Sequence, residues 1–186
     1  MLSEIKNRTE NFSIKNKNNL ESRDGKRLKS KLADLKQNVK EKEKKETEKP
    51  IQLLTRNQEL EGKRHPETNV EYKRRRIRID GKLYEGVFPV FDSKFDVQLP
   101  FNKIKVRESE QFKYCTKKLA ERIQKDPEFS KQFDERQKQA ILAGKEKIPG
   151  LTWHHNEKTG LMQLVDEDIH KKTGHTGGNS LWGTGC

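Results

Sequence analysis

The sequence predicts an α+β fold preceded by a charged helical arm, and three patterns support this. The pair Asp80-Gly81 separates two runs rich in β-branched residues, which is the strongest short-range signal of a β-hairpin. Between Glu108 and Gly144 apolar residues recur at helical spacing. Residues 151–182 follow the pattern strand, turn, strand and short helix. Small sheets and several helices are therefore expected.

The arm comprises residues 1–58, which are rich in Lys, Glu, Asn and Gln. Only a thin apolar stripe at near-helical spacing runs through it, formed by Leu20, Leu28, Leu32, Leu35 and Val39. We interpret the arm as a helical linker, with a partner-recruiting or delivery segment as the alternative. Because the composition changes near Glu59, residues 59–186 are expected to form the functional domain.

The expected hairpin carries a dense group of cations on its first strand, among them Arg74, Arg75 and Arg76. Such a ribbon can contact phosphates, or it can be an ordinary charged solvent face with Ile77 and Ile79 turned inward. Residues 88–91 are apolar and should supply core. Residues 95–99 alternate apolar and polar side chains, which predicts another strand.

The helical region shows recognisable start and stop signals. Ser109 is the expected N-cap of a first helix, with Phe112, Cys115, Leu119 and Ile123 along one face. Two further helices should begin at the caps Asp126 and Asp134, and Gly144 is the expected stop. We interpret these residues as packing features.

The composition favours a polyanionic partner. The formal net charge is +12 with a pI near 9.6, and Lys and Arg that neutralise phosphates release counterions on binding. An acidic membrane surface, an acidic protein or simple solubility are the alternatives. A hydrophobic content of 29% against 38% charged residues predicts that part of the chain lies outside any core. No run reaches membrane-spanning length, and the first residues lack the apolar core of a signal peptide.

Four of the five histidines fall within residues 151–182, and neutral imidazole is the commonest metal ligand in proteins. Adjacent strand residues point to opposite faces, so His154 and His155 should divide into one ligand and one base. His170 and His175 are five residues apart, which fits no helical face, but a helix ending near Gly174 would let His175 swing back. Surface histidines in a Gly-rich tail and a structural zinc site with four histidine ligands are the alternatives.

These residues resemble the WHH branch of the HNH/endonuclease VII superfamily, nuclease domains found at the C-termini of bacterial polymorphic toxins such as the LXG toxins. The resemblance covers roughly residues 60–186. In the C-terminal stretch it rests on Trp153-His154-His155, Gly160, residues 162–165, His170, His175-Thr176-Gly177-Gly178 and Trp182-Gly183, and upstream it extends through residues 62–66, 85–89, 91–93 and 97–100. It implies a ββα-metal (His-Me finger) core within residues 151–182.

In that scheme His154, His170 and His175 bind one divalent metal ion (Zn, Mg, Mn or Ni), and His155 is the general base. Gln163 stands near the position where many members have an asparagine that orients the base or buttresses the loop, and Asp166 or Asp168 is the alternative to His175 as ligand. The predicted contacts to the nucleic-acid backbone are Arg74, Arg75, Arg76, Lys147, Lys171 and Lys172.

The resulting hypothesis is a metal-dependent endonuclease of low sequence specificity that cuts DNA. It acts as a bacterial antagonistic toxin and is neutralised by an acidic immunity protein. We expect delivery by a specialised export system without a cleaved signal peptide, and action in the cytoplasm of the target cell. The alternatives are an RNase toxin of the same fold and a non-catalytic, metal-stabilised module that binds nucleic acid.

Overall fold

The structure is a computed structural model that describes residues 26–27, 29–37 and 48–183. The chain divides into two units, residues 1–49 and 50–186. In the first unit residues 29–37 are helical, as expected for the arm, and Leu32 and Leu35 are exposed. The other residues of the predicted apolar stripe lie outside the described residues. The division of roles at residue 59 stays a prediction.

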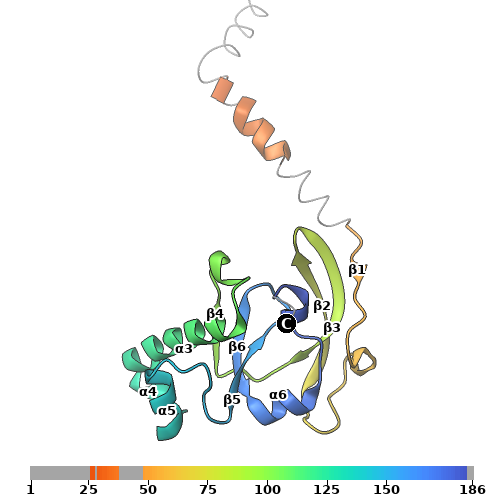
Figure 1. Cartoon of the computed structure of the whole chain (residues 1–186). Coiled ribbons are helices and arrows are strands. Elements are labelled where there is room, and N and C mark those ends of the chain that lie inside the picture. Colours follow the sequence, from red (N-terminus) through yellow and green to blue (C-terminus); the bar gives the residue numbers. More distant parts are fainter. Residues whose placement is uncertain (1–25, 28, 38–47, 184–186) are drawn as a thin grey trace, which may run out of the picture. The chain divides into compact units, whose positions relative to one another are not determined.

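The second unit contains two small sheets (Figure 1). The first has the order β1-β3-β2, where β1 (Ile51–Gln52) pairs in parallel with β3 (Lys82–Val90), and β3 pairs antiparallel with β2 (Glu71–Ile79). The predicted hairpin is confirmed. Its two turn residues, Asp80 and Gly81, have φ values of 49° and 79°, which is the left-handed conformation that an Asp-Gly pair tolerates.

Strand β1 lies within the stretch that the sequence assigned to the arm. Two residues are too few to show any periodicity, so this strand could not be predicted from the sequence pattern. The short helical turn η1 (Gln58–Leu60) follows it and leads towards β2.

The second sheet is antiparallel with the order β4-β6-β5, formed by β4 (Phe95–Gln98), β5 (Leu151–His155) and β6 (Leu161–Asp166). All three strands were predicted. The turn between β5 and β6 closes at Gly160, whose φ is 75°. In the register His154 lies opposite Gln163 and His155 opposite Met162, so the two histidines belong to opposite faces of this sheet.

One face of the second sheet is covered by α3 (Glu108–Lys125), which packs with α4 (Pro127–Ser130) and α5 (Glu135–Leu142). The core between them joins three buried α3 residues to strand and loop residues. The α3 residues are Cys115, Leu119 and Ile123, as the periodicity predicted. Their strand partners include Val97, Trp153, Met162 and Leu164.

The predicted caps at Asp126 and Asp134 are confirmed, because their side chains accept hydrogen bonds from the backbone N–H groups of Phe129 and Gln137. The predicted cap at Ser109 is wrong. Helix α3 begins one residue earlier, at Glu108, and its N-cap Arg107 makes no side-chain capping bond. The acidic residues of the first turn stabilise this start through the helix dipole instead.

The opposite face of the second sheet meets α6 (Glu167–Thr173). Asp166 caps this helix by accepting from the N–H of Ile169 at 2.9 Å, and the helix ends at Thr173, before Gly174 with a φ of 48°. The predicted helix end is thus confirmed. Two short helical segments, η2 (Phe101–Lys103) and α7 (Gly178–Leu181), complete the described elements. No helix within the described ranges is long and apolar enough to cross a membrane.

Two leucines on neighbouring helices allow a test of this core. Leu119 is fully buried and Leu142 is 54% exposed. We expect Leu119→Ala to lower the free energy of unfolding by about 2–5 kcal/mol, because the substitution leaves a cavity, and Leu142→Ala to change it by less than about 0.5 kcal/mol. Urea denaturation of both variants measures the difference. Equal effects would contradict the described packing.

Candidate metal centre

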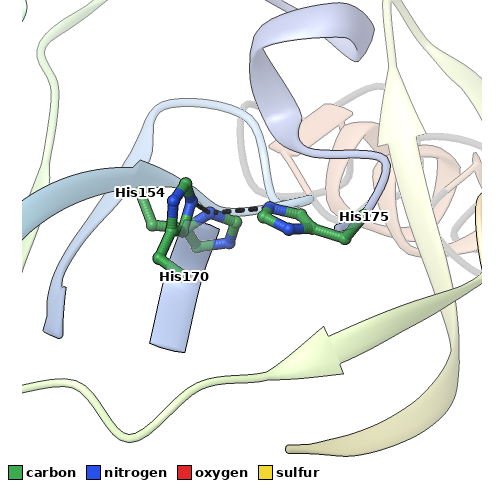
Figure 2. A group of neighbouring side chains, drawn as sticks. All are labelled: His154, His170 and His175. Carbon is green, nitrogen blue, oxygen red and sulfur yellow. Dashed lines mark hydrogen bonds between the residues drawn. The ribbon is translucent and has the colours of Figure 1, made fainter. Parts of the chain in front are cut away.

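Three imidazole rings meet between the second sheet and α6 (Figure 2). His154 comes from β5, His170 from α6, and His175 from the loop after it. The Nδ1 atom of His154 lies 3.1 Å from Nε2 of His170 and 3.2 Å from Nε2 of His175. The three ligand atoms lie within 4.8 Å of one another. The structure therefore brings together the three histidines that the sequence assigned to one ion.

The polar atoms of this cluster are not satisfied by hydrogen bonds alone. The Nδ1 atom of His175 is buried and has no hydrogen-bond partner, which in a buried site costs about 1–3 kcal/mol. The Nδ1 atom of His154 faces two ring nitrogens and can share only one proton at a time. Three ring nitrogens this close together suit a cation, since in a tetrahedral zinc site neighbouring ligand nitrogens lie about 3.3 Å apart. The residues present fit one divalent ion with an open coordination position.

The surroundings keep these rings neutral, which is the form that binds a metal. Burial, together with the neighbouring histidines, holds the pKa of His154 well below its usual value. Burial also lowers the pKa of His170. Burial, His170 and Arg56 lower the pKa of His175 to about 3.

Phe91 forms an apolar wall against all three rings. Its ring centroid lies 4.8 Å from that of His154, 5.3 Å from that of His170 and 5.1 Å from that of His175. Phe91 is itself buried with Val70 and Val165. The sequence predicted Phe91 as core, but it did not reveal that this core residue borders the three-histidine cluster.

His155 lies on the other face of β5, away from the three-histidine cluster. Its Nε2 atom is 2.7 Å from Oε1 of Gln111, a buried residue of α3. The amide nitrogen of Gln111 donates to the carbonyls of Lys103 and Ile104 at 3.0 and 2.8 Å. These two bonds fix the amide orientation, so its oxygen must accept from His155. The Nε2 atom of His155 therefore carries the proton, and Nδ1 keeps its lone pair.

Aromatic rings enclose His155 as well. The rings of Phe112 and Trp182 lie 5.8 and 5.3 Å from it. Burial, followed by the charge of His170, lowers the pKa of His155 to about 4. This imidazole is therefore uncharged at neutral pH.

Gln163 lies on the metal-centre face of the sheet, beside His154. Its amide oxygen accepts from Asn156 at 2.9 Å, and its amide nitrogen donates to Asp96 at 3.2 Å. Neither of these contacts involves His155. The three-histidine cluster also forms without the alternative acidic ligands, because Asp166 caps α6 and Asp168 pairs with Lys172 at 2.8 Å.

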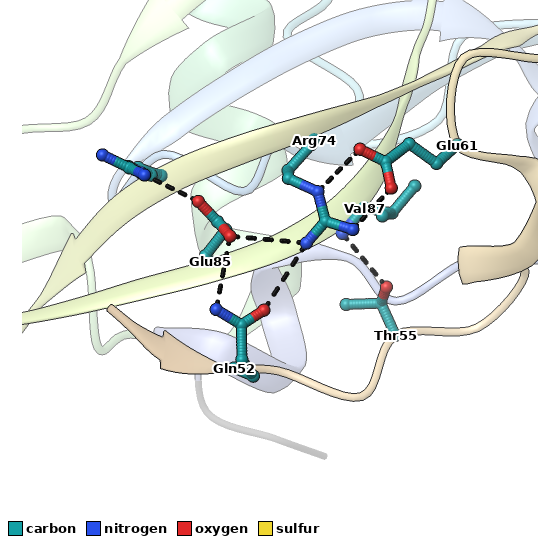
Figure 3. A network of polar contacts seen from close by, with 7 residues as sticks. Gln52, Thr55, Glu61, Arg74, Glu85 and Val87 are labelled. Carbon is teal, nitrogen blue, oxygen red and sulfur yellow. Dashed lines mark hydrogen bonds and ion pairs between the residues drawn. The ribbon is translucent and has the colours of Figure 1, made fainter. Parts of the chain in front are cut away.

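The arginines of β2 that were predicted to contact the nucleic-acid backbone have acidic neighbours (Figure 3). The guanidinium of Arg74 makes two hydrogen bonds to Glu61, one of them 2.6 Å long, and contacts Glu85 at 3.4 Å. Arg76 donates to Glu85 at 2.8 Å. Hydrogen bonding to Arg74 and to Arg76 lowers the pKa values of Glu61 and Glu85, respectively. All three predicted arginines are therefore already engaged in ion pairs, since Arg75 pairs with Glu157.

The other cationic side chains that were predicted to contact nucleic acid are distributed over the second unit. Arg75 lies 4.0 Å from the buried carboxylate of Glu157. Lys172 pairs with Asp168, while Lys147 and Lys171 are exposed. Lys171 follows His170 directly on α6, which makes it the predicted cation nearest in sequence to the cluster.

Comparison with known proteins agrees with a nuclease. The family model described as the DNase/tRNase domain of colicin-like bacteriocin matches residues 80–177, which is more than half of the chain. The protein is therefore a hydrolase of the nuclease class. It belongs to the family of colicin-like bacteriocin DNase/tRNase domains, with DNA or tRNA as substrate. No curated protein and no solved structure matches the chain.

The lowered histidine pKa values predict a pH-dependent stability of the metal-free protein. Unfolded imidazoles take up protons near pH 6.5, and the buried ones only at lower pH, so below pH 6.5 the unfolded state binds more protons. The free energy of unfolding should fall as the pH falls from 6.5 towards 4, by up to about 1.4 kcal/mol per pH unit for each histidine.

Urea denaturation in EDTA at pH values between 7.5 and 5 measures this slope. His175→Gln removes one of the titrating groups, so its slope should be shallower than that of the wild type. Identical slopes would show that His175 is not held neutral by burial.

Proposed function

We propose that this nuclease is a WHH-type endonuclease toxin whose ββα-metal core consists of β5, β6 and α6, and that it cuts DNA with one divalent ion. The observation that carries the proposal is the convergence of His154 Nδ1, His170 Nε2 and His175 Nε2 in a chain of the colicin-like DNase/tRNase family. Residues 59–186 are proposed to contain the enzyme, and residues 1–58 to serve as a linker.

In this proposal the three histidines hold Zn, Mg, Mn or Ni. A bound divalent ion supplies Lewis-acid stabilisation of the charge that develops on the scissile phosphate. The apolar wall of Phe91 excludes water from one side of the cluster, which strengthens the electrostatic interactions of that site.

His155 is proposed as the general base. Its burial keeps the ring neutral, and the bond to Gln111 leaves Nδ1 free to accept a proton from water. Because His155 lies on the far face of β5, this role requires the phosphate to sit at the end of the strand, where His155 is the last residue. Gln111 acts through His155 as a positioning residue, because it fixes the tautomer.

Gln163 is proposed to buttress the turn between β5 and β6. It connects Asp96 of β4 to Asn156, and the side-chain oxygen of Asn156 accepts from the N–H of Lys158 at 3.0 Å. This chain of bonds favours the loop-buttressing role over contact with the base.

The wider biological role follows from the family and the charge. The net charge of +12 favours the nucleic-acid backbone and an acidic immunity protein. The residues proposed to contact phosphates are Arg74, Arg75, Arg76, Lys147, Lys171 and Lys172. The three arginines and Lys172 would have to exchange their carboxylate partners. Delivery without a cleaved signal peptide and action in the target-cell cytoplasm are part of the same proposal.

The cleavage test compares wild type, His154→Ala and His155→Ala on plasmid DNA and on tRNA. Removing a metal ligand or the base should lower the cleavage rate by about 10²-fold or more. EDTA should abolish wild-type cleavage, and adding back Zn, Mg, Mn or Ni one at a time should identify the ion that restores it. Gln139→Ala, an exposed α5 residue, is the control and should cut at the wild-type rate.

Each outcome has a separate meaning. Faster cleavage of tRNA than of DNA would replace the DNase proposal with the RNase alternative. Wild-type activity in His155→Ala would show that this buried ring has a packing role only. Cleavage that survives EDTA would overturn the metal-dependent mechanism.

A further inference from the structure

The loop that presents His175 is held by residues far away in the sequence. Helix α6 ends at Thr173, and the chain turns at Gly174 before His175. The last carbonyls of a helix have no partners within that helix. A loop of this kind keeps one conformation only if other groups satisfy these carbonyls.

Asn57 and Tyr72 supply those groups. The amide nitrogen of Asn57 donates to the carbonyl of Gly174 at 2.7 Å and to that of Thr173 at 3.1 Å. The Tyr72 hydroxyl lies 3.1 and 3.2 Å from the same two carbonyls and 3.2 Å from the amide nitrogen of Asn57. Tyr72 is fully buried, so the network has a rigid base.

Flanking contacts hold the loop on both sides. The backbone N–H of Arg56 donates to Oγ1 of Thr176 at 3.0 Å, directly after His175. The hydroxyls of Thr68 and Thr173 share a hydrogen bond of 2.8 Å. The guanidinium of Arg56 lies so close to Gly174 that a Cβ there would meet its atoms at 3.0–3.2 Å. Both ends of the loop are thus joined to the segment between Arg56 and Tyr72.

We propose that Asn57 is a positioning residue for the metal centre, and that Tyr72 shares this role. Asn57 fixes the carbonyls of Thr173 and Gly174, and through them it directs the imidazole of His175 at His154 and His170. The inference rests on the proposed function, because the metal is the reason for holding His175 in place.

The residue type fits this role. Asn57 has a φ of 63°, and asparagine tolerates the left-handed conformation better than most residues. Its amide nitrogen has two N–H donors, as two carbonyl acceptors require, whereas aspartate has none when ionised. Asn57 lies in the stretch predicted as arm and outside the matched residues 80–177. The chain therefore uses a segment outside the matched region to order a ligand within it.

The test is Asn57→Gly in the full chain, with Asn69→Gly as the matched control. Glycine preserves the left-handed conformation and removes only the side chain. Asn69 has a φ of 58°, but among the described residues its side chain makes no hydrogen bond to the loop of His175. The two variants therefore share the backbone effect and differ in the donor to Thr173 and Gly174.

Two measurements are compared. In EDTA, amide hydrogen exchange should become faster at residues 174–176 in Asn57→Gly and remain as in wild type in Asn69→Gly. In Co²⁺ titrations followed by visible absorption, Asn57→Gly should bind about 10- to 100-fold more weakly, the usual effect of losing a residue that orients a metal ligand. Its spectrum should also change, which a general loss of stability would not produce.

Unchanged exchange together with wild-type Co²⁺ affinity in Asn57→Gly would overturn the proposal, and so would equal losses in the two glycine variants. If the wild type binds no metal, the proposed function fails, while the exchange comparison still decides the role of Asn57. Should Asn57→Gly not fold, Tyr72→Phe serves as the second variant. This variant keeps the buried ring and removes only the hydroxyl that contacts the carbonyls of Thr173 and Gly174. The same two measurements therefore apply to it.

Discussion

Neighbouring residues of a β-strand point to opposite faces of its sheet, and in β5 these residues are His154 and His155. One face meets α6 and the other meets α3, so each histidine enters a different environment. A register shift of one residue would exchange them and would also remove Trp153 from the core against α3. The apolar core against α3 therefore determines which histidine joins the metal centre.

The metal centre in turn combines burial with incomplete hydrogen bonding. His154 and His175 are neutral rings in apolar surroundings, and one ring nitrogen lacks any partner. The lone pairs of His154 Nδ1, His170 Nε2 and His175 Nε2 face one another at a cost in free energy unless a cation accepts them, so metal binding and folding should be linked. The bonds from Asn57 and Tyr72 hold the loop of His175 in place despite this cost.

Much of this arrangement could be predicted because its signals are local. The Asp80-Gly81 turn, the cap at Asp134 and the helix end before Gly174 each depend on one or two residues, and the three metal candidates share one short stretch. The roles of Gln111 and Asn57 could not be predicted. Gln111 is 44 residues from His155, and Asn57 is 117 from Gly174. The amide of Gln111 reaches His155 only because α3 packs on the sheet, and the amide of Asn57 reaches Gly174 only through the packing of β1 and η1. No local sequence pattern predicts this packing.

The ion pairs of the arginines on β2 could not be predicted from the local sequence either. The cations of β2 looked like one basic ribbon, yet alternation along the strand gives Arg74 and Arg76 the same acidic neighbour, Glu85. The net charge of +12 attracts a polyanion from a distance, since it belongs to the whole chain. The final position of a phosphate depends on cations near the reacting atoms. Lys171 is exposed on α6 directly after His170 and forms no ion pair among the described residues, whereas the arginines of β2 are paired.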